Sequence, residues 1–437
     1  MSSISAHLLS RSASGRPLGF TRLSSFISSI SHLTDAESQL YFEHLDAKSR
    51  LRAQQPPCRI SQGRPAPRFL RPQIHDPRSS SWVALEKTKV QEGLGRGKLL
   101  KVVSGNIECF GPGPAARASA ALGHLTGLFG EEPGPLVVML QEVQRESLQA
   151  IMDNSWVQRN FVLSNVEPPE SIYTDTAGDS FVLRDIEWGA HPYFTLMMTP
   201  RHLAITSCFR VPFVTKMGRD ALVVDIPVFS PGRCTQLKES FRLCTTHLES
   251  LWEGRVYRPG QLALISALLK GAPATESKIT AGLNTSSTSV WEDVPAPPIP
   301  VFKPFQKDLS YGQARGNTWS HQSKSSRERK RMDKFFYTGS LETVAIHEAQ
   351  DITGRLGRLG ISLKTEVEAW EFEYKRFKKS SLRRGKYVEE PHKIYFSESA
   401  VAKFRDEEQL VRRELVHTKI NAWVSDHFGI AVGIKVL

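Results

Sequence analysis

Four short polar motifs stand at the ends of apolar runs in this chain. They contain Asn106, Glu142, His247 and the adjacent pair Asp426 and His427. A carboxylate at a strand end can bind a hard cation, an amide can donate to a phosphate oxygen, and a protonated imidazole stabilises charge on phosphoryl oxygens. The residue types and their order therefore predict metal-dependent hydrolysis of a phosphate ester.

Glu142 follows an apolar run at residues 136–141. Because magnesium takes few carboxylates and keeps several waters, one such glutamate can be its principal protein ligand. A single glutamate at a strand end is more often structural. The presence of the other motifs favours the metal-binding role.

Asn106 and His247 each have a functional and a structural interpretation. Asn106 follows Gly105, so its side chain either contacts a phosphate or forms a turn. His247 stands in a Thr-Thr-His-Leu-Glu-Ser segment after an apolar run, where it either contacts a phosphate or packs as a structural residue. Neither motif decides the question by itself.

The segment Ser425, Asp426, His427 is the most specific local signal, because an apolar strand pattern follows it closely. Its spacing lets the Asp426 carboxylate fix the imidazole or touch the metal shell while His427 faces the phosphate. A protonated His427 would stabilise the charge that develops on the phosphoryl oxygens.

Short β-branched apolar runs begin at Leu99 and alternate with a few helical stretches, which predicts an α/β domain. Two runs, residues 136–140 and 221–224, are apolar throughout and are expected to be buried on both faces. Two packed sheets covered by helices would bury them in this way. The predicted strands are residues 99–104, 136–141, 193–198, 221–226, 241–246, 334–337 and 429–436, and the predicted helices are residues 115–129 and 258–269.

The composition is that of an ordinary globular protein, with 437 residues, 40% hydrophobic and 23% charged. No apolar run is long enough for a transmembrane helix, so no membrane association is expected. The net charge of +12 favours a polyanionic partner, although a basic surface without such a partner has the same composition. Five cysteines without paired spacing indicate a reduced compartment and neither a zinc site nor a redox dithiol.

Three regions differ from the α/β pattern. Residues 1–54 form a Ser/Arg-rich tail whose first 34 residues contain no acid, as in a mitochondrial presequence or a disordered tail. Residues 55–98 are rich in Pro and Arg and are expected to be a linker with little structure. The domain then covers residues 99–437 and includes a charged helical insertion at 361–422, which is either solvated or faces the substrate.

Taken together, the motifs resemble those of the endonuclease/exonuclease/phosphatase superfamily, and within it those of the 5′-tyrosyl-DNA phosphodiesterase (type 2) group. The resemblance covers residues 99–437, and the His-Leu-Glu-Ser segment at 247–250 and the Val-Trp-Glu segment at 290–292 are its most group-specific parts. It implies a four-layered α/β/β/α sandwich of two mostly antiparallel sheets covered by helices.

The resemblance also implies roles for the motif residues. Glu142 would be the principal ligand of Mg²⁺, for which Mn²⁺ can substitute. Asn106 and His247 would lie near the scissile phosphate. His427 would stabilise the transition state and be oriented by Asp426.

Two further residues belong to motifs of this group. Arg219 ends a Thr-Lys-Met-Gly-Arg segment and would bind the substrate, and Asp333 would be a structural acid before a strand. Gly105 stands where the group usually has a tryptophan, which packs and does no chemistry.

One motif of the group is missing. The group has Gly-Asp-x-Asn after a strand, with the aspartate as general base or positioner of the attacking water, but this chain reads Gly-Leu-Asn-Thr from Gly282. Only seven residues separate Gly282 from Val290, too few for both the motif and the loop that follows it. Asn284 is either the surviving substrate-binding asparagine or the end of that loop. Loss of a general base costs about 10² to 10⁴ in rate, so residual activity is compatible with the gap.

The predicted activity is magnesium-dependent hydrolysis of the 5′-phosphotyrosyl bond between a trapped protein and DNA, in DNA repair. The alternatives are a catalytically silent nucleic-acid-binding protein of the same fold and an enzyme that acts on RNA ends, abasic DNA or a small phosphate ester. The expected partner is DNA with a 5′ protein adduct, and the chain is expected to be a monomer.

The compartment has two candidates. The resemblance indicates the nucleus, and the five basic residues at 324–331 are a nuclear import signal, a phosphate-contacting loop or a solvated stretch. The acid-free N-terminus indicates the mitochondrion instead.

Overall fold

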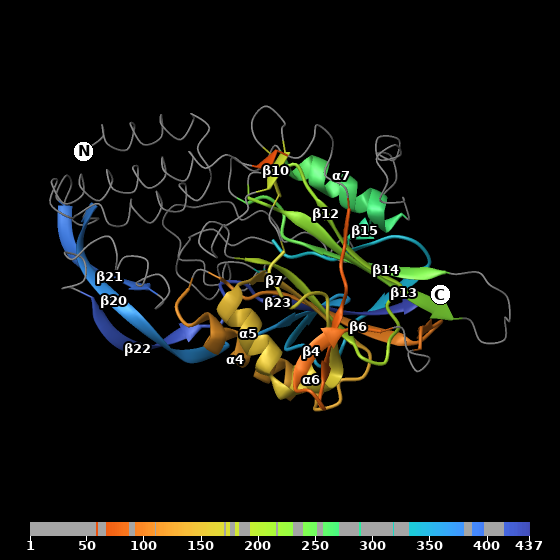
Figure 1. The fold of residues 1–437 in the computed structure, drawn as a ribbon. Coiled ribbons are helices and arrows are strands. Elements are labelled where there is room, and N and C mark those ends of the chain that lie inside the picture. Colours follow the sequence, from red (N-terminus) through yellow and green to blue (C-terminus); the bar gives the residue numbers. More distant parts are fainter. Residues whose placement is uncertain are drawn as a thin grey trace.

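The computed structural model has a mixed α/β fold with two main β-sheets (Figure 1). None of the helices that the structure describes is long and apolar enough to cross a membrane. The described residues are 58–59, 67–86, 92–109, 111–169, 172–174, 180–182, 193–215, 217–229, 239–250, 257–270, 288–289, 318, 332–379, 387–396 and 415–437.

The larger sheet has ten strands. In sequence order they are β3 (Gln73–Asp76), β4 (Ser81–Ala84), β6 (Leu99–Asn106), β7 (Leu136–Val143), β8 (Phe161–Leu163), β11 (Phe194–Pro200), β17 (Leu341–Val344), β18 (Asp351–Thr353), β19 (Leu356–Leu359) and β23 (Gly429–Val436). Their spatial order is β18-β19-β23-β6-β7-β11-β8-β3-β4, and β17 also pairs with β23. All described pairings in this sheet are antiparallel except that of β6 with β7.

The smaller main sheet has five strands. They are β2 (Arg68–Phe69), β5 (Leu94–Gly95), β12 (Ser207–Pro212), β13 (Asp220–Phe229) and β14 (Ser240–Thr246). The order is β14-β13-β12-β2, with β5 parallel to the end of β13.

Three small sheets complete the strand content of the described residues. They are β1 (Cys58–Arg59) with β10 (Ser180–Val182) and β9 (Ile172–Thr174), β15 (Thr288–Ser289) with β16 (Phe336–Tyr337), and β21 (Tyr387–Phe396) with β20 (Lys364–Lys379) and β22 (Val416–Trp423).

Four helices are described, and local sequence explains where they begin. They are α4 (Pro114–Phe129), α5 (Arg145–Asp153), α6 (Ser155–Asn160) and α7 (Arg258–Leu269). Proline stands at the start of α4 and α7, where its missing N–H costs nothing. The side chain of Asn154 caps α6 by accepting from the backbone N–H groups of Trp156 and Val157.

Three apolar clusters fix how these elements pack. The first joins α4, α5 and α6 to the larger sheet and includes Leu122 and Leu196. The second lies between the two main sheets and includes Leu222, whereas the neighbouring Val223 belongs to the third, which also contains Leu268 of α7. Successive residues of β13 thus serve two different cores, and the helices lie on the outer sides of the two sheets (Figure 1).

The predicted burial of two strands on both faces is confirmed. Every residue at 136–140 and at 221–224 is buried. The predicted strands are all present, although the one at 334–337 is limited to β16, and both predicted helices are present as α4 and α7.

The expectation that residues 55–98 form an unstructured linker is wrong for the part that the structure describes. Strands β3 and β4 extend the larger sheet, and β2 and β5 belong to the smaller one. These strands are two to four residues long, too short for a periodic pattern to show against their Pro- and Arg-rich surroundings. The α/β domain therefore begins before Leu99.

The helix predicted within the insertion at 361–422 is also wrong. The described parts of the insertion include β20, β21 and β22, which form an antiparallel sheet. Val367 and Ala369 are buried while Glu366 and Glu368 are exposed, which is the period of two that a half-buried strand requires. The many charged residues and few turn residues of this segment favour a helix in the sequence pattern, although the structure has strands.

Leu196 tests the packing of the larger sheet, because its side chain is fully buried in the first cluster. We expect Leu196→Ala to lower the free energy of unfolding by about 2 to 5 kcal/mol, since a cavity adds to the lost transfer free energy. Leu262→Ala is the matched control, because Leu262 is 39% exposed. Denaturant titration measures both variants, and equal losses would contradict the packing described here.

Candidate active site

The parallel pairing of β6 and β7 brings two of the motifs to one edge of the larger sheet. The register pairs Asn106 with Gln141, so Asn106 and Glu142 lie at the same ends of neighbouring strands. Gln141 Nε2 donates to Ser104 Oγ at 3.0 Å and to Thr245 Oγ1 at 3.1 Å, which ties β14 of the smaller sheet to this edge. The polar cluster therefore lies where the two sheets meet.

Glu142 is held in one orientation. The residue is 6% exposed, and its Oε2 accepts hydrogen bonds from the backbone N–H of Cys109 at 3.1 Å and from its Sγ at 3.2 Å. Its φ is 60°, in the left-handed region that non-glycine residues rarely adopt. Such conformations persist where the surroundings fix them, and here two donors fix the carboxylate.

Asn106 is buried, and its Oδ1 accepts a hydrogen bond from the backbone N–H of Glu108 at 2.8 Å. Its oxygen therefore forms the local turn that the structural interpretation expects. The same bond orients the side-chain NH₂ group, which is the donor that a phosphate contact needs. The two interpretations of Asn106 are compatible.

His247 begins the loop that follows β14. Its Nδ1 lies 3.7 Å from Oε1 of Glu142 and 3.1 Å from Nη1 of Arg219. Its Nε2 lies 3.4 Å from Oγ of Ser250. Because Glu142 comes from the larger sheet and His247 follows the smaller one, packing of the two sheets is what brings these residues together.

Arg219 lies beside His247 with its guanidinium over an aromatic ring. Its Cζ is 4.8 Å from the centre of the Tyr193 ring, within cation–π range. Thr215 Oγ1 accepts from the backbone N–H of Arg219 at 3.1 Å and holds the preceding segment. Tyr193 is a site residue that the sequence does not predict, because it stands outside every motif. The arrangement places a permanent positive charge near Glu142, as binding of a phosphate requires.

His427 forms a hydrogen-bonded ion pair with Asp333. The Nδ1 of His427 lies 2.8 Å from Oδ2 of Asp333, whereas Oδ1 of Asp426 lies 3.8 Å from Nε2, beyond hydrogen-bond range. The orienting role predicted for Asp426 belongs to Asp333 in the structure. The two residues are 94 positions apart, so no local spacing could have indicated this contact.

Thr318 holds Asp333 next to the strand that follows His427. Its Oγ1 accepts from the backbone N–H groups of Met332 and Asp333, at 3.2 and 3.1 Å. Its carbonyl oxygen accepts from the backbone N–H of Phe428 at 2.7 Å. One threonine thus connects the segments that carry both members of the ion pair.

The ion pair determines the charge of His427. Burial lowers the pKa of His427, but the Asp333 carboxylate, with Asp426 and Glu142 farther along, raises it more, to about 9. Burial raises the pKa of Asp333, and the facing imidazolium lowers it below its ordinary value. Both groups are therefore charged at neutral pH.

Glu108 is a second residue of the site that the sequence does not predict. Burial raises its pKa to about 7, the Arg117 guanidinium at 2.8 Å opposes that rise, and Asp426 and Glu142 add to it. Three carboxylates thus lie near enough to repel one another. A divalent cation beside Glu142 would relieve this repulsion.

The donors present fit magnesium better than a transition metal. Among the residues that the structure describes, no three His, Cys, Asp or Glu side chains are arranged to hold one metal ion. Zinc needs about four such ligands, whereas magnesium accepts one or two carboxylates and fills its remaining positions with water and substrate oxygens. Glu142 is the residue that would hold it.

Asn284 and the segment from Gly282 to Thr285 lie outside the described residues. The predicted substrate-binding role of Asn284 and the consequence of the missing motif stay predictions. The other predicted site residues lie at one edge, which is where β6 and β7 end and β23 begins.

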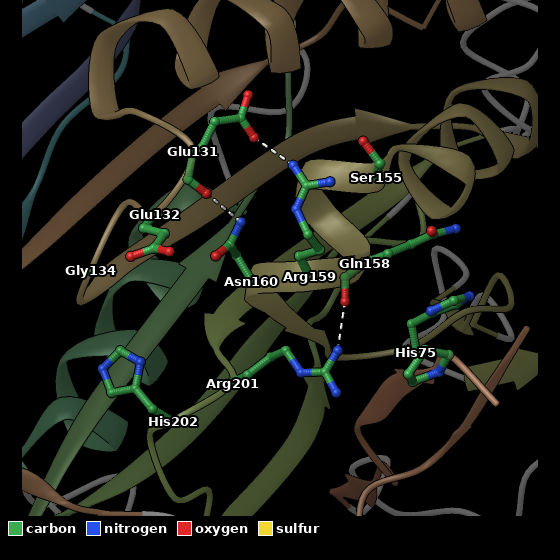
Figure 2. Close-up of a pocket in the computed structure, with 11 residues that line it drawn as sticks. His75, Glu131, Glu132, Gly134, Ser155, Gln158, Arg159, Asn160, Arg201 and His202 are labelled. Carbon is green, nitrogen blue, oxygen red and sulfur yellow. Dashed lines mark hydrogen bonds and ion pairs between the residues drawn. The ribbon is translucent and has the colours of Figure 1, made fainter.

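Figure 2 shows a separate pocket of about 980 Å³ at the opposite end of β7. Gly134 precedes β7 there and Arg201 follows the antiparallel β11, so the pocket lies away from Glu142. Its charged groups have partners, since Arg159 pairs with Glu131 and Arg201 Nη1 donates to the backbone carbonyl of Gln158 at 2.6 Å. None of the predicted site residues lines this pocket.

No protein-family model matches the sequence, and no curated protein matches it. Among solved structures, the chain is similar to an endonuclease/exonuclease/phosphatase family protein from Bacteroides thetaiotaomicron, with 11% identity, a TM-score of 0.35, and coverage of 77% of this chain and 97% of that chain. It is also similar to humanized D. rerio TDP2 carrying 14 mutations, with 15% identity, a TM-score of 0.40, and coverage of 77% of this chain and 99% of that chain. Both similarities are at low sequence identity and low TM-score.

Replacing Asp333 tests the ion pair. Asp333→Asn removes the main cause of the raised pKa of His427, so we expect that pKa to fall from about 9 toward its ordinary value of 6.5, because burial opposes the remaining effect of Asp426 and Glu142. Titration of the imidazole by NMR measures the change. An unchanged value would show that Asp333 does not set the charge of His427.

The same variant changes how stability depends on pH. A histidine whose folded pKa is raised contributes stability that is complete below about pH 6.5 and is lost as the pH rises through about 9. We expect this loss in the free energy of unfolding of the wild type and its absence in Asp333→Asn. Denaturant titrations between these pH values measure it.

Proposed function

We propose that this chain is a magnesium-dependent phosphodiesterase that hydrolyses the 5′-phosphotyrosyl bond of protein–DNA adducts, within a four-layered α/β/β/α sandwich. The observation that carries the proposal is that His247 contacts both Glu142 and Arg219. The charged His427–Asp333 pair lies at the same edge of the larger sheet. A carboxylate for a hard cation thus lies beside cationic groups for a phosphate. Fold and site together suit phosphate-ester hydrolysis.

The reaction follows from these charges. Water attacks the phosphorus, the bond between phosphorus and the tyrosyl oxygen breaks, and a 5′-phosphate and a tyrosine phenol result. Protonated His427 stabilises the negative charge that grows on the phosphoryl oxygens, and Asp333 keeps it protonated. Arg219 and the amide of Asn106 bind the phosphate. Glu142 would hold magnesium, which would supply Lewis-acid stabilisation of negative charge on the phosphate.

The choice of a tyrosyl-DNA substrate rests on sequence. The His-Leu-Glu-Ser and Val-Trp-Glu segments resemble the 5′-tyrosyl-DNA phosphodiesterase group, and the net charge of +12 suits a nucleic-acid partner. The same resemblance supports the nucleus as the compartment. A fluorescent fusion of the first 60 residues distinguishes this from mitochondrial import.

A second candidate is a catalytically silent nucleic-acid-binding protein of the same fold. The observation that favours it is the sequence after Gly282, which lacks the Gly-Asp-x-Asn motif of the group. Such a protein would keep the metal ligand and the basic surface but lack the residue that positions water.

Turnover of a 5′-tyrosyl oligonucleotide distinguishes the two candidates. We expect magnesium-dependent release of tyrosine at a low rate, and insertion of the missing Asp, Asn and loop after Gly282 is expected to raise that rate by about 10² to 10⁴. Abasic and polyadenylate substrates serve as controls for the kind of ester. Salt-sensitive DNA binding without turnover in either protein would favour the silent candidate.

Glu142 provides a test that isolates the metal. We expect Glu142→Gln to lower kcat by at least about 10²-fold and to weaken magnesium binding, because the neutral amide keeps the shape but loses the charge. Isothermal titration with magnesium alone gives a readout that does not require activity. Gln149→Glu, on the outer side of α5, is a control in which an exposed side chain undergoes the reverse exchange of amide and carboxylate. Equal metal binding by wild type and Glu142→Gln would exclude Glu142 as the ligand.

A further inference from the structure

The sheet of β20, β21 and β22 forms an arm that extends from the body of the protein (Figure 1, left). Strand β20 has 16 residues, and its second half pairs with β21 while its first half pairs with β22. At about 3.3 Å per residue β20 is roughly 50 Å long. The arm is therefore long compared with the strands of the main sheets.

The base of the arm is joined to the candidate active site. Strand β22 ends at Trp423, and the backbone N–H of Val424 donates to the carbonyl of Leu363 at 3.1 Å, so the arm leads directly into Asp426. On the other strand Val367 is 2% exposed and packs on Gly113, where a Cβ would lie 2.6 Å from the Cβ of Val367. The arm thus begins beside the residues that face the phosphate.

Charges near the base are neutralised within the arm. Glu366 pairs with Lys419 at 3.2 Å, and Glu371 pairs with Lys393 at 2.6 Å. Lys364 lies over the Trp423 ring at 4.2 Å. These pairs join neighbouring strands and leave little net charge in this part of the arm.

The far end of the arm has the opposite character. Lys375, Arg376, Lys378 and Lys379 are four of the last five residues of β20, and Lys379 pairs with Tyr387 at the end of the hairpin. Between residues 375 and 390 the chain contains seven Lys or Arg and two Glu. The last residues of β20, the half of the strand that pairs with β21, are therefore rich in basic residue types.

We propose that the basic end of this arm binds the phosphates of a nucleic-acid duplex that extends out of the active site. The proposal rests on the proposed function, because it assumes that a nucleic-acid end occupies the site. Clustered Lys and Arg bind duplex phosphates through release of counterions. A duplex is stiff over about 150 bp, so a strand-built arm roughly 50 Å long meets it at a defined distance from its end.

The test compares binding of a short and a long duplex by the full chain. The variant carries Lys375→Gln, Arg376→Gln, Lys378→Gln and Lys379→Gln. For a duplex of about 40 bp, we expect at least a tenfold loss of affinity and a decrease of up to about 4 in the slope of log K against log salt. For a duplex of about 8 bp, which does not reach the end of the arm, we expect little change in affinity. Fluorescence anisotropy measures both.

The matched control removes four exposed positive charges from the body of the protein. It carries Arg71→Gln, Arg78→Gln, Lys98→Gln and Arg145→Gln, all at exposed residues. We expect its loss of affinity to be equal for the two duplexes. Circular dichroism and thermal unfolding check that both variants are folded.

Two results would overturn the proposal. One is equal loss by the arm variant on long and short duplexes, which would mean a general charge effect and a solvated arm. The other is no loss on either, which would assign the arm to a different partner, such as a second copy of this chain. Turnover of a short 5′-tyrosyl oligonucleotide by the wild type is measured separately. If turnover is absent but the arm variant loses affinity for the long duplex alone, the proposed reaction is contradicted and the role of the arm is not.

Discussion

The parallel pairing of β6 and β7 is the constraint on which the site depends. It sets Asn106 and Glu142 at the same sheet edge, whereas an antiparallel pair would set the strand ends at opposite edges. Both strands lie between a layer of helices and the second sheet, so their register is fixed by burial on two faces. The arrangement of these polar residues is thus a by-product of core packing.

A second constraint is the compensation of buried charge. Acids at this edge come from several segments, and two of them face a cation: Asp333 faces protonated His427, and Glu108 faces Arg117. Glu142 lies near the imidazole of His247. An isolated buried carboxylate would take up a proton, as the raised pKa of Glu108 shows in part. The cationic groups that face these acids therefore keep part of the negative charge of the site.

Strong periodic patterns allowed much of this to be predicted from sequence. The strands ending near Asn106 and Glu142 and the helix at Arg258–Leu269 follow from continuous apolar runs and helical spacing. The partner of His427 could not be predicted, because the contact with Asp333 spans 94 positions and exists only in the folded chain. The sequence of β20 predicts a helix because many of its alternating positions are charged residues, which carry little weight in hydrophobic patterns.

The backbone conformation of Glu142 affects which residue types are favourable at this position. Its φ of 60° costs a side-chain-bearing residue roughly 1 kcal/mol or more, whereas glycine adopts it freely. Glycine would avoid this cost but would remove the carboxylate that accepts from the backbone N–H and Sγ of Cys109. The left-handed backbone therefore lowers stability where the fold holds a carboxylate in one orientation.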